Sequence, residues 1–233
     1  MSRLGLHPGR IVVVVPAFNE ENVITEVLRD LAAFPSRIVV VDDGSSDKTA
    51  DLAVQAGALV LRHPCNLGQG AALQTGIDFA VARPETEVIV TFDGDGQHAA
   101  QDLPRLVAPV CEQGYDVTLG SRFLPGSSLV GASTSRRLTL RLATVFTRVT
   151  SGLALSDAHN GLRAFDVRAA ARVRITQNGM AHASEILFQI ARLGLRYCEV
   201  PATVRYTPYS LGKGQRMANS LNILWDLVSG TMK

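Results

Sequence analysis

The chain has 233 residues, of which 46% are hydrophobic and 19% are charged. These values are typical of a folded globular protein and exclude a disordered, collagen-like or disulfide-scaffold chain. Lys and Arg number 23 against 21 for Asp and Glu, so bulk charge does not indicate nucleic acid as a partner.

The cysteines and the N-terminus bound the cellular setting. Cys65, Cys111 and Cys198 are an odd number without CxxC spacing, which excludes a disulfide framework or a zinc site and predicts mostly buried free thiols. The N-terminus lacks the apolar stretch of a signal peptide, and no run reaches the roughly 18 apolar residues that span a bilayer. We therefore expect a cytoplasmic protein.

Apolar, β-branched runs alternate with helical patterns through the first half of the chain. Strands are predicted at 11–15, 37–41, 58–61, 87–92 and 115–119. Such runs suit strands buried on both faces, and the intervening helices predict a parallel α/β sheet. Ligands of such sheets bind at the carboxyl ends of the strands. Here those ends carry PAFNEEN, DDGSSDKT, HPCNLGQG and DGDGQH.

The pattern changes after Gly120. It predicts a Gly/Ser-rich loop at 124–135, an amphipathic helix at 136–151, a polar segment at 157–163, a helix at about 181–193, a short β pair at about 196–206 and a last helix. No repeat or linker separates the halves. We expect one domain over 1–233, with a nucleotide-type half at about 10–120, an acceptor-type half at about 121–215 and an amphipathic C-terminal helix at 216–233.

The triplet Asp93-Gly94-Asp95 follows the fourth predicted strand directly, with Gln97 just beyond it. Hard divalent cations such as Mg²⁺ or Mn²⁺ take oxygen ligands and bridge to substrate phosphates through one or two carboxylates. Gly94 permits close approach of another backbone segment. The alternative is an Asx turn that ends the strand.

Acidic and aromatic side chains also follow the first two strands. Asp42 and Asp43 precede a predicted helix, so one Ser or Asp there is expected to cap it. Two adjacent carboxylates exceed what a cap needs, and one is placed to accept hydrogen bonds from a nucleobase. Phe18 and Glu20 are placed to flank that base, although capping and packing explain them nearly as well. The segment NLGQG at 66–70 lacks the GxGxxG and P-loop patterns, which excludes hydride transfer and ATPase chemistry.

Four cations of the second half lie at loops or element ends near Gly or Pro, namely Arg122, Arg163, Arg205 and Lys213. Guanidinium groups bind phosphate through two parallel hydrogen bonds. Any one of these residues could equally be a solvated surface cation. Together they indicate an anion-binding acceptor half.

The helix predicted at 136–151 has a cationic stripe beside an apolar face. The stripe holds Arg137, Arg141, Thr144 and Arg148, and the apolar face holds Leu138, Leu142, Val145, Phe146 and Val149. Such a helix can lie in a membrane interface with its arginines toward lipid phosphates. The commoner alternative is packing of the apolar face on the sheet.

Seven motifs occur in the order PAFNEE, VDDGSSDKT, NLGQGAALQTGI, FDGDGQH, LGSRF, NGLRAF and EVPATVRY. This combination, over about residues 10–215, resembles family 2 glycosyltransferases of the GT-A fold, in the polyprenyl-phosphate sugar transferase branch (the dolichol-phosphate mannose synthase type). The resemblance implies a Rossmann-like, mostly parallel sheet flanked by helices, with a C-terminal acceptor-binding portion. It also implies a nucleotide-sugar donor, Mg²⁺ or Mn²⁺, and inversion at the anomeric carbon.

The resemblance also assigns residues. It implies metal and diphosphate ligands at Asp93, Asp95 and Gln97. Nucleotide-sugar contacts fall on Pro16, Ala17, Phe18, Glu20, Asp42, Asp43, Asn66, Gly70, Asp93 and Gly94. Acceptor-phosphate contacts fall on Arg122, Arg163, Arg205 and Lys213, and the cationic stripe of the helix at 136–151 adds Arg137 to this set. The stretch VRYTPYSLGKG, which carries Arg205 and Lys213, departs from the family's Arg-Gly-Ser-Lys spacing. We expect the catalytic residues to be Asp95, Asp157 and Arg163.

These features favour transfer of a hexose from a UDP-glucose or GDP-mannose type donor to polyprenyl phosphate at the cytoplasmic membrane face. A phosphate monoester is anionic near pH 7, so it needs positioning more than a general base, and Asp157 would orient the acceptor or sugar. One alternative is a hydroxyl acceptor in polysaccharide or glycoconjugate synthesis, with Asp157 as the base. Another is a non-catalytic nucleotide-sugar-binding subunit, against which the intact acidic triplet argues.

The lipid acceptor has a consequence for location. Because no spanning helix is predicted, we expect a peripheral protein at the inner face of the membrane. It would reach its acceptor through the membrane surface or a small membrane-protein partner.

Overall fold

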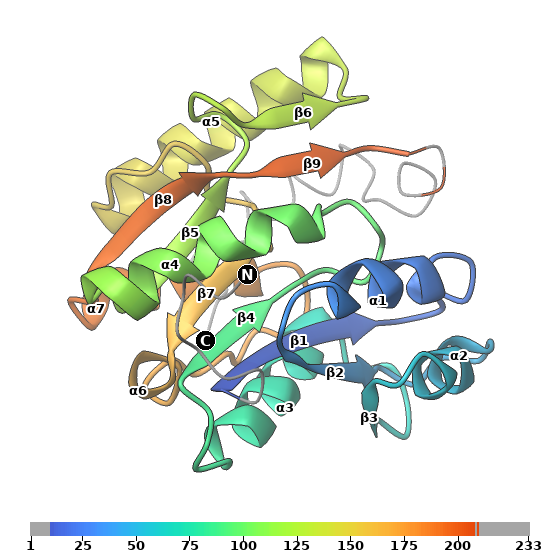
Figure 1. The fold of residues 1–233 in the computed structure, drawn as a ribbon. Helices are drawn as coiled ribbons and strands as arrows, with labels where there is room; N and C mark the ends of the chain where they lie inside the picture. The colour runs from blue at the N-terminus through green and yellow to red at the C-terminus, as the bar shows by residue number, and fades with distance from the viewer. Residues whose placement is uncertain (1–9, 208, 210–233) are drawn as a thin grey trace.

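The computed structural model describes residues 10–207 and residue 209 (Figure 1). Its main sheet has seven strands in the order β3-β2-β1-β4-β7-β5-β8. The strands are β1 (Ile11–Ala17), β2 (Arg37–Asp42), β3 (Leu59–Arg62), β4 (Val88–Thr91), β5 (Val117–Ser121), β7 (Arg163–Asp166) and β8 (Tyr197–Pro201). β7 runs antiparallel to both neighbours, and the other neighbouring pairs are parallel. The expected mostly parallel α/β sheet is confirmed.

Helices cover both faces of the sheet (Figure 1). They are α1 (Ile24–Ala32), α2 (Thr49–Gln55), α3 (Gln69–Val81), η2 (Ala100–Asp102), α4 (Leu103–Gln113), α5 (Thr134–Ser151), α6 (Val167–Ala170) and α7 (His182–Arg192). In β1, Val12 and Val14 pack in the core with α3, α6 and α7, whereas Val13 and Val15 pack with α1, α2 and α4. Alternate strand residues point to opposite faces, so the uniformly apolar β1 fills both cores.

The five strands predicted in the first half occur where expected, with ends shifted by one or two residues. The Ser or Asp cap predicted before α2 is wrong, because Lys48 occupies the N-cap position and makes no side-chain cap hydrogen bond. The Asp47 Oδ1 atom accepts a hydrogen bond from the Thr49 N–H at 2.9 Å. This bond satisfies a backbone donor that the first turn of α2 leaves without a helical partner.

The second half departs from prediction in its strands. The loop at 124–135 contains β6 (Ser128–Val130), which pairs in parallel with β9 (Thr203–Arg205) in a small second sheet. The predicted β pair at 196–206 is therefore wrong, because β8 pairs with β5 and β9 with β6. Only Ala202 separates β8 from β9, which is too short for a hairpin turn. β7 was missed because it has four residues and begins inside the polar segment.

Helix α5 lies at the β8 side of the sheet, away from β3 and α2 (Figure 1). Its buried residues are Ala143, Thr144 and Thr147. Leu138 and Leu142, by contrast, are exposed. Packing of the apolar face on the sheet is thus wrong, and the helix docks through its small residues instead.

Across residues 10–207 and residue 209, no helix combines the length and apolar character needed to cross a bilayer. The three cysteines are free, as predicted, although Cys65 is exposed and Cys111 and Cys198 are only partly buried. Lys213 and the helix predicted at 216–233 lie outside the described residues.

Candidate active site

Asp93 lies just beyond the end of β4, where two side chains hold its carboxylate. Gln69, at the start of α3, donates from Nε2 to Oδ1 at 2.9 Å. The His98 Nε2 atom lies 3.0 Å from Oδ2. Burial alone would raise the pKa of Asp93, but the hydrogen bond and charge of His98, with the charges of His182 and Arg163, hold that pKa below its usual value. Asp93 is therefore a fixed carboxylate anion.

Asp95 has the opposite electrostatics. Burial first, and then the charges of Asp93 and Glu20, raise the pKa of Asp95 to about 6, although His98 and the Gln97 N–H oppose the shift. The Gln97 N–H donates to Asp95 Oδ1 at 3.0 Å. A desolvated carboxylate beside a second one is a place where a cation relieves repulsion.

These residues fit the divalent cation that the fold implies. Asp93, Asp95 and the Gln97 amide offer hard oxygen atoms, which Mg²⁺ and Mn²⁺ prefer. No group of three or more His, Cys, Asp or Glu side chains suited to a metal occurs in the part of the chain that the structure describes. The protein would therefore supply few ligands, as is usual for a cation shared with substrate phosphates.

Two glycines let other segments approach these carboxylates. A Cβ atom on Gly94 would lie 2.8 Å from the Pro16 carbonyl oxygen, which confirms the close approach expected there. A Cβ atom on Gly161, in the NGLRAF motif, would lie 2.3 Å from Asp93 Oδ2. Thr91 also donates from Oγ1 to the Gly161 carbonyl at 2.7 Å. The NGLRAF turn is thus held against the acidic triplet.

The loops after β1 and β2 are joined by hydrogen bonds. The Asn19 N–H donates to Ser45 Oγ at 2.9 Å, and the Glu20 N–H donates to Thr49 Oγ1 at 2.7 Å. Asn19 has φ of 54°, in the left-handed region that Asn tolerates better than most residues. Tyr209 donates from its hydroxyl to Glu20 Oε2 at 2.8 Å. Glu20 is therefore already engaged at this edge.

Asp43 organises the loop before α3. Its carboxylate accepts the Leu67 N–H at 2.9 Å and the Gly68 N–H at 2.8 Å. The His63 Nδ1 atom lies 2.7 Å from Asp43 Oδ1. Asp43 is buried, and through these hydrogen bonds it holds the NLGQG loop in place. This contact is additional to the nucleobase contact that the sequence predicts for Asp43.

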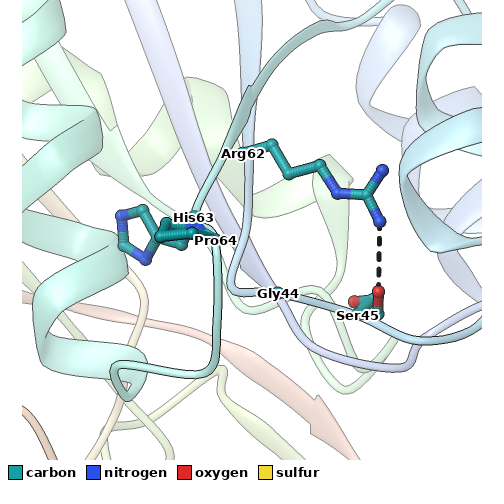
Figure 2. A pocket seen from close by; sticks show the side chains of 5 residues that line it. All are labelled: Gly44, Ser45, Arg62, His63 and Pro64. Carbon is teal, nitrogen blue, oxygen red and sulfur yellow. Dashed lines mark hydrogen bonds between the residues drawn. The ribbon is translucent and has the colours of Figure 1, made fainter.

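A pocket of about 360 Å³ opens between the loops after β2 and β3 (Figure 2). It is lined by Gly44, Ser45, Arg62, His63 and Pro64. Figure 2 shows Arg62 reaching the Ser45 carbonyl, to which it donates from Nη2 at 3.2 Å.

Asp42 lies behind this pocket. It is fully buried and pairs through Oδ2 with Arg62 Nε at 3.1 Å. The loop after β2 borders this concave site through Gly44 and Ser45, whereas Phe18, Glu20 and Asp43 are not among its lining residues. Arg62 joins Asp42 to the wall of the site.

Arg163 begins β7 at the same edge of the sheet. It lies opposite Thr91 of β4 and Leu119 of β5 in the strand register. Burial lowers the pKa of Arg163 to about 10, while the charges of Asp93 and Asp157 oppose the shift. Its Nη2 atom donates to the Ala183 carbonyl at 3.2 Å. Arg163 thus provides a buried cation within the field of both carboxylates.

Arg122 and Asp157 form a buried, two-point ion pair. Arg122 Nε lies 2.6 Å from Asp157 Oδ2, and Nη2 lies 2.6 Å from Oδ1. Burial would raise the pKa of Asp157, but the charge and hydrogen bonds of Arg122 hold that pKa below its usual value. Arg122 Nη1 also donates to the Tyr206 hydroxyl at 3.1 Å. Two residues predicted to meet substrate therefore meet each other.

Glu199 of β8 holds the segment that carries Asp157. Its carboxylate accepts the Ser156 N–H at 2.7 Å and the Asp157 N–H at 3.1 Å. Burial, with the charge of Asp157, raises the pKa of Glu199. The strand thus fixes Asp157 through its backbone.

The remaining arginines lie around this pair. Arg137 donates from Nη2 to the Leu129 carbonyl at 2.8 Å. It therefore anchors β6, in addition to the acceptor contact predicted for it. Arg205 ends β9 and is exposed, and its N–H donates to the Gln97 carbonyl at 2.9 Å. A backbone hydrogen bond therefore joins the loop after β4, which carries Asp93, Asp95 and Gln97, to the small second sheet.

Sequence reasoning missed four side chains that order the site, namely Gln69, His98, Glu199 and Tyr206. Each lies inside a motif that the sequence shows. A carboxylate or imidazole in such a motif indicates a function in the site, but the group to which it hydrogen-bonds lies on an element distant in the sequence. Glu199 and Ser156 are 43 residues apart, so spacing alone gives no indication of the contact.

Comparison with known proteins agrees with this geometry. The chain is 37% identical over 226 residues to an uncharacterised protein of Methanocaldococcus jannaschii, covering 96% of this chain and 93% of the relative. It is 33% identical over 204 residues to an undecaprenyl-phosphate mannosyltransferase of Micrococcus luteus, covering 83% of each. A glucosyl-3-phosphoglycerate synthase of Mycobacterium tuberculosis, solved with Mn²⁺, UDP and product, superposes with a TM-score of 0.69 at 22% identity, over 95% of this chain and 80% of that one.

The sheet, with its single antiparallel strand beside an acidic turn, is that of a GT-A glycosyltransferase. The family model for glycosyl transferase family 2 matches residues 12–174, and the chain belongs to that family. The resemblance to its polyprenyl-phosphate sugar transferase branch is confirmed by the mannosyltransferase relative.

Proposed function

We propose that this enzyme moves a hexose from a nucleotide-diphosphate sugar to polyprenyl phosphate, with inversion, at the cytoplasmic face of the membrane. The carrying observation is the division of charge along one sheet edge. Asp93 and Asp95 follow β4, whereas the buried Arg163 begins the neighbouring β7. A cation-bound diphosphate and an anionic acceptor are the two ligands that such an edge attracts.

On the donor side, the nucleobase occupies the pocket lined by Arg62 and Ser45, between the loops after β2 and β3. The diphosphate then lies over Asp95 and Gln97, which would hold Mg²⁺ or Mn²⁺ together with Asp93. The bound cation supplies Lewis-acid stabilisation of the leaving diphosphate. Gln69 and His98 keep the Asp93 carboxylate in one orientation.

On the acceptor side, the phosphate binds near Arg163 and the Arg122–Asp157 pair. A phosphate monoester already carries negative charge, so the protein mainly has to position its oxygen against the sugar. Asp157 suits this better than proton transfer, because both its oxygens accept from Arg122 and its pKa is lowered. This pairing disfavours the hydroxyl-acceptor alternative, which needs a free base.

A matched pair of acceptors tests the proposal. The purified enzyme is given UDP-glucose or GDP-mannose with Mn²⁺ and either a polyprenyl phosphate or the corresponding polyprenol. We expect a lipid-soluble product with the phosphate only. Transfer to the polyprenol alone would overturn the proposed acceptor.

The cation has its own test. Excess EDTA and Asp95→Ala should each abolish turnover, because Asp95, with Asp93 and Gln97, would supply the oxygen ligands of the cation at the end of β4. Asp30→Ala, at an exposed position of α1, is the matched control and should retain full activity. Normal turnover in EDTA would contradict a required cation.

A further inference from the structure

Helix α5 exposes a continuous apolar row. Leu138 is 59% exposed, Leu142 61%, Val145 55% and Val149 80%. At about 100° per residue, these four positions lie within an arc of about 60°. We call them the α5 stripe. Single exposed apolar residues are ordinary, whereas a contiguous set marks a contact surface.

The charge of α5 is of one sign. Its eighteen residues include four arginines and no Asp or Glu. Arg136 stacks over the Tyr206 ring at 4.5 Å, and Arg141 lies over the Phe123 ring at 5.5 Å. Arg141 and Arg148 both lie along one side of the α5 stripe in the helical projection. The surface therefore combines an apolar row with a cationic border.

The opposite face of α5 contacts the acceptor side of the site. Thr144 is buried, and its Oγ1 atom accepts the Ala158 N–H at 3.3 Å. Ala158 follows Asp157, the partner of Arg122. The α5 stripe and Asp157 are thus separated by one helix, whose diameter is about 10 Å. Any surface that binds the stripe is brought close to the site where the acceptor phosphate is proposed to bind.

We propose that the α5 stripe, with Arg141 and Arg148, docks on an anionic lipid membrane, with α5 lying flat in the interface. The proposed lipid acceptor explains why the enzyme would dock on a membrane, and in that respect the inference rests on the proposed function. The docking surface itself is defined by the exposure and charge of α5. Interfacial helices of this composition bind anionic bilayers through buried apolar side chains and attraction to the headgroups.

Charge selects lipid over the other possible occupants of the stripe. A second copy would present the same four arginines. The C-terminal part of this chain, residues 210–233, contains Lys213, Arg216 and Lys233 against Asp226, so it too is cationic. Anionic headgroups are complementary where both of these would be repelled.

Vesicle flotation of the full chain tests the proposal, using phosphatidylcholine with and without phosphatidylglycerol. The wild type should float only with phosphatidylglycerol, and less so at high salt. Leu138→Gln/Leu142→Gln/Val149→Gln should reduce the floated fraction about tenfold. Val54→Gln is the matched control, because Val54 of α2 is 60% exposed outside α5, and it should float like the wild type.

A second variant and its control test the contribution of the arginines to membrane binding. Arg141→Gln/Arg148→Gln should weaken flotation about as much, whereas Arg168→Gln/Arg192→Gln, at exposed positions of α6 and α7, should not. The proposal is overturned if the wild type fails to float, or if the stripe variant floats equally. A wild-type dimer that the stripe substitutions dissociate, without lipid binding, would assign the stripe to a second copy instead.

Activity separates this inference from the proposed function. With a short, water-dispersible polyprenyl phosphate, the stripe variant should turn over like the wild type, because its substitutions do not contact the site. Flotation as expected, with no turnover by either protein, would refute the lipid acceptor and leave the docking surface standing. Turnover with lost flotation in the variant supports both.

Discussion

Arg122 and Asp157 satisfy each other through two charged hydrogen bonds of 2.6 Å, with Tyr206 as a third partner of the guanidinium. A buried ion pair contributes little net stability, but removal of one partner leaves an uncompensated charge. We expect Asp157→Ala or Arg122→Ala to lower the free energy of unfolding by about 3–5 kcal/mol. Urea unfolding measures this.

The double variant Arg122→Met/Asp157→Leu separates stability from function. It should recover most of the lost unfolding free energy while remaining inactive, because the proposed function of the pair is to place the acceptor and not to hold the fold. Additive losses in the double variant would show that the two residues are not coupled.

The two aspartates of the acidic triplet should have opposite effects on the stability of the metal-free protein. The pKa of Asp95 is raised from 3.8 to about 6, so the folded state keeps this proton longer than the unfolded state. The stability that this gives is complete below about pH 4 and is lost as pH rises through about 6. Asp95→Asn mimics the neutral form and should stabilise the protein above pH 6 by about 1–3 kcal/mol.

Asp93→Asn should instead destabilise it. The pKa of Asp93 is lowered in the folded state, so its contribution is present above the unfolded pKa and is lost as pH falls. Unfolding in EDTA across pH 4–8 checks both signs. The same sign for the two variants would contradict the environments described above.

We propose that Glu199 is a positioning residue that acts on the reaction through Asp157. Glu199→Ala removes the acceptor of two backbone N–H groups, those of Ser156 and Asp157. We expect a stability loss of about 1.5–3 kcal/mol and a lower kcat, with the KM for the donor nearly unchanged.

Asp116→Asn is the matched control for Glu199. Asp116 Oδ2 also accepts a backbone N–H, that of Arg196 at 2.7 Å, but at the other end of the β5–β8 pair. Its effect on kcat should be small. Partial recovery of kcat in Glu199→Gln would support positioning, and equal kcat losses in the Glu199→Ala and Asp116→Asn variants would indicate a purely structural role.

Gly161→Ala should impair the donor site without unfolding the protein. The added Cβ atom would meet Asp93 Oδ2 at 2.3 Å, which forces the carboxylate or the NGLRAF turn to shift. We expect turnover to fall by at least about tenfold, since small displacements at a reacting centre are costly. Gly179→Ala is the matched control, because nothing lies within 4 Å of the added Cβ atom and, as at Gly161, φ is not positive.

Sequence periodicity was sufficient for the first half of the fold because each buried strand is a run such as Ile11–Ala17, apolar on both faces. It failed for β6 and β7, which are three and four residues long and are defined by their partners. The apolar arc of α5 was misjudged for a related reason. Periodicity identifies the apolar side of a helix, but not whether anything packs against it.

The site shows the same limit. Asp93 and Asp95 could be placed at one sheet edge because they follow a predicted strand, whereas Arg163 could not, because β7, which it begins, was not predicted. The pairing of Arg122 with Asp157 could not, because it depends on how β5 and the segment before β7 approach each other in space. A motif predicts which side chains matter, whereas their mutual contacts require the tertiary structure.

Ala202 joins the two sheets by a single residue. Its N–H donates to the Ser121 carbonyl of β5 at 2.8 Å, and its carbonyl accepts the Ser128 N–H of β6 at 3.3 Å. A hinge needs residues whose backbone torsions are free to change, and this linker is bonded on both sides and buried. The small sheet therefore cannot swing away to admit a long isoprenoid. For the proposed polyprenyl phosphate acceptor, adjustment to different chain lengths then falls to the lipid tail outside the protein, and the rate should depend little on isoprene units remote from the phosphate.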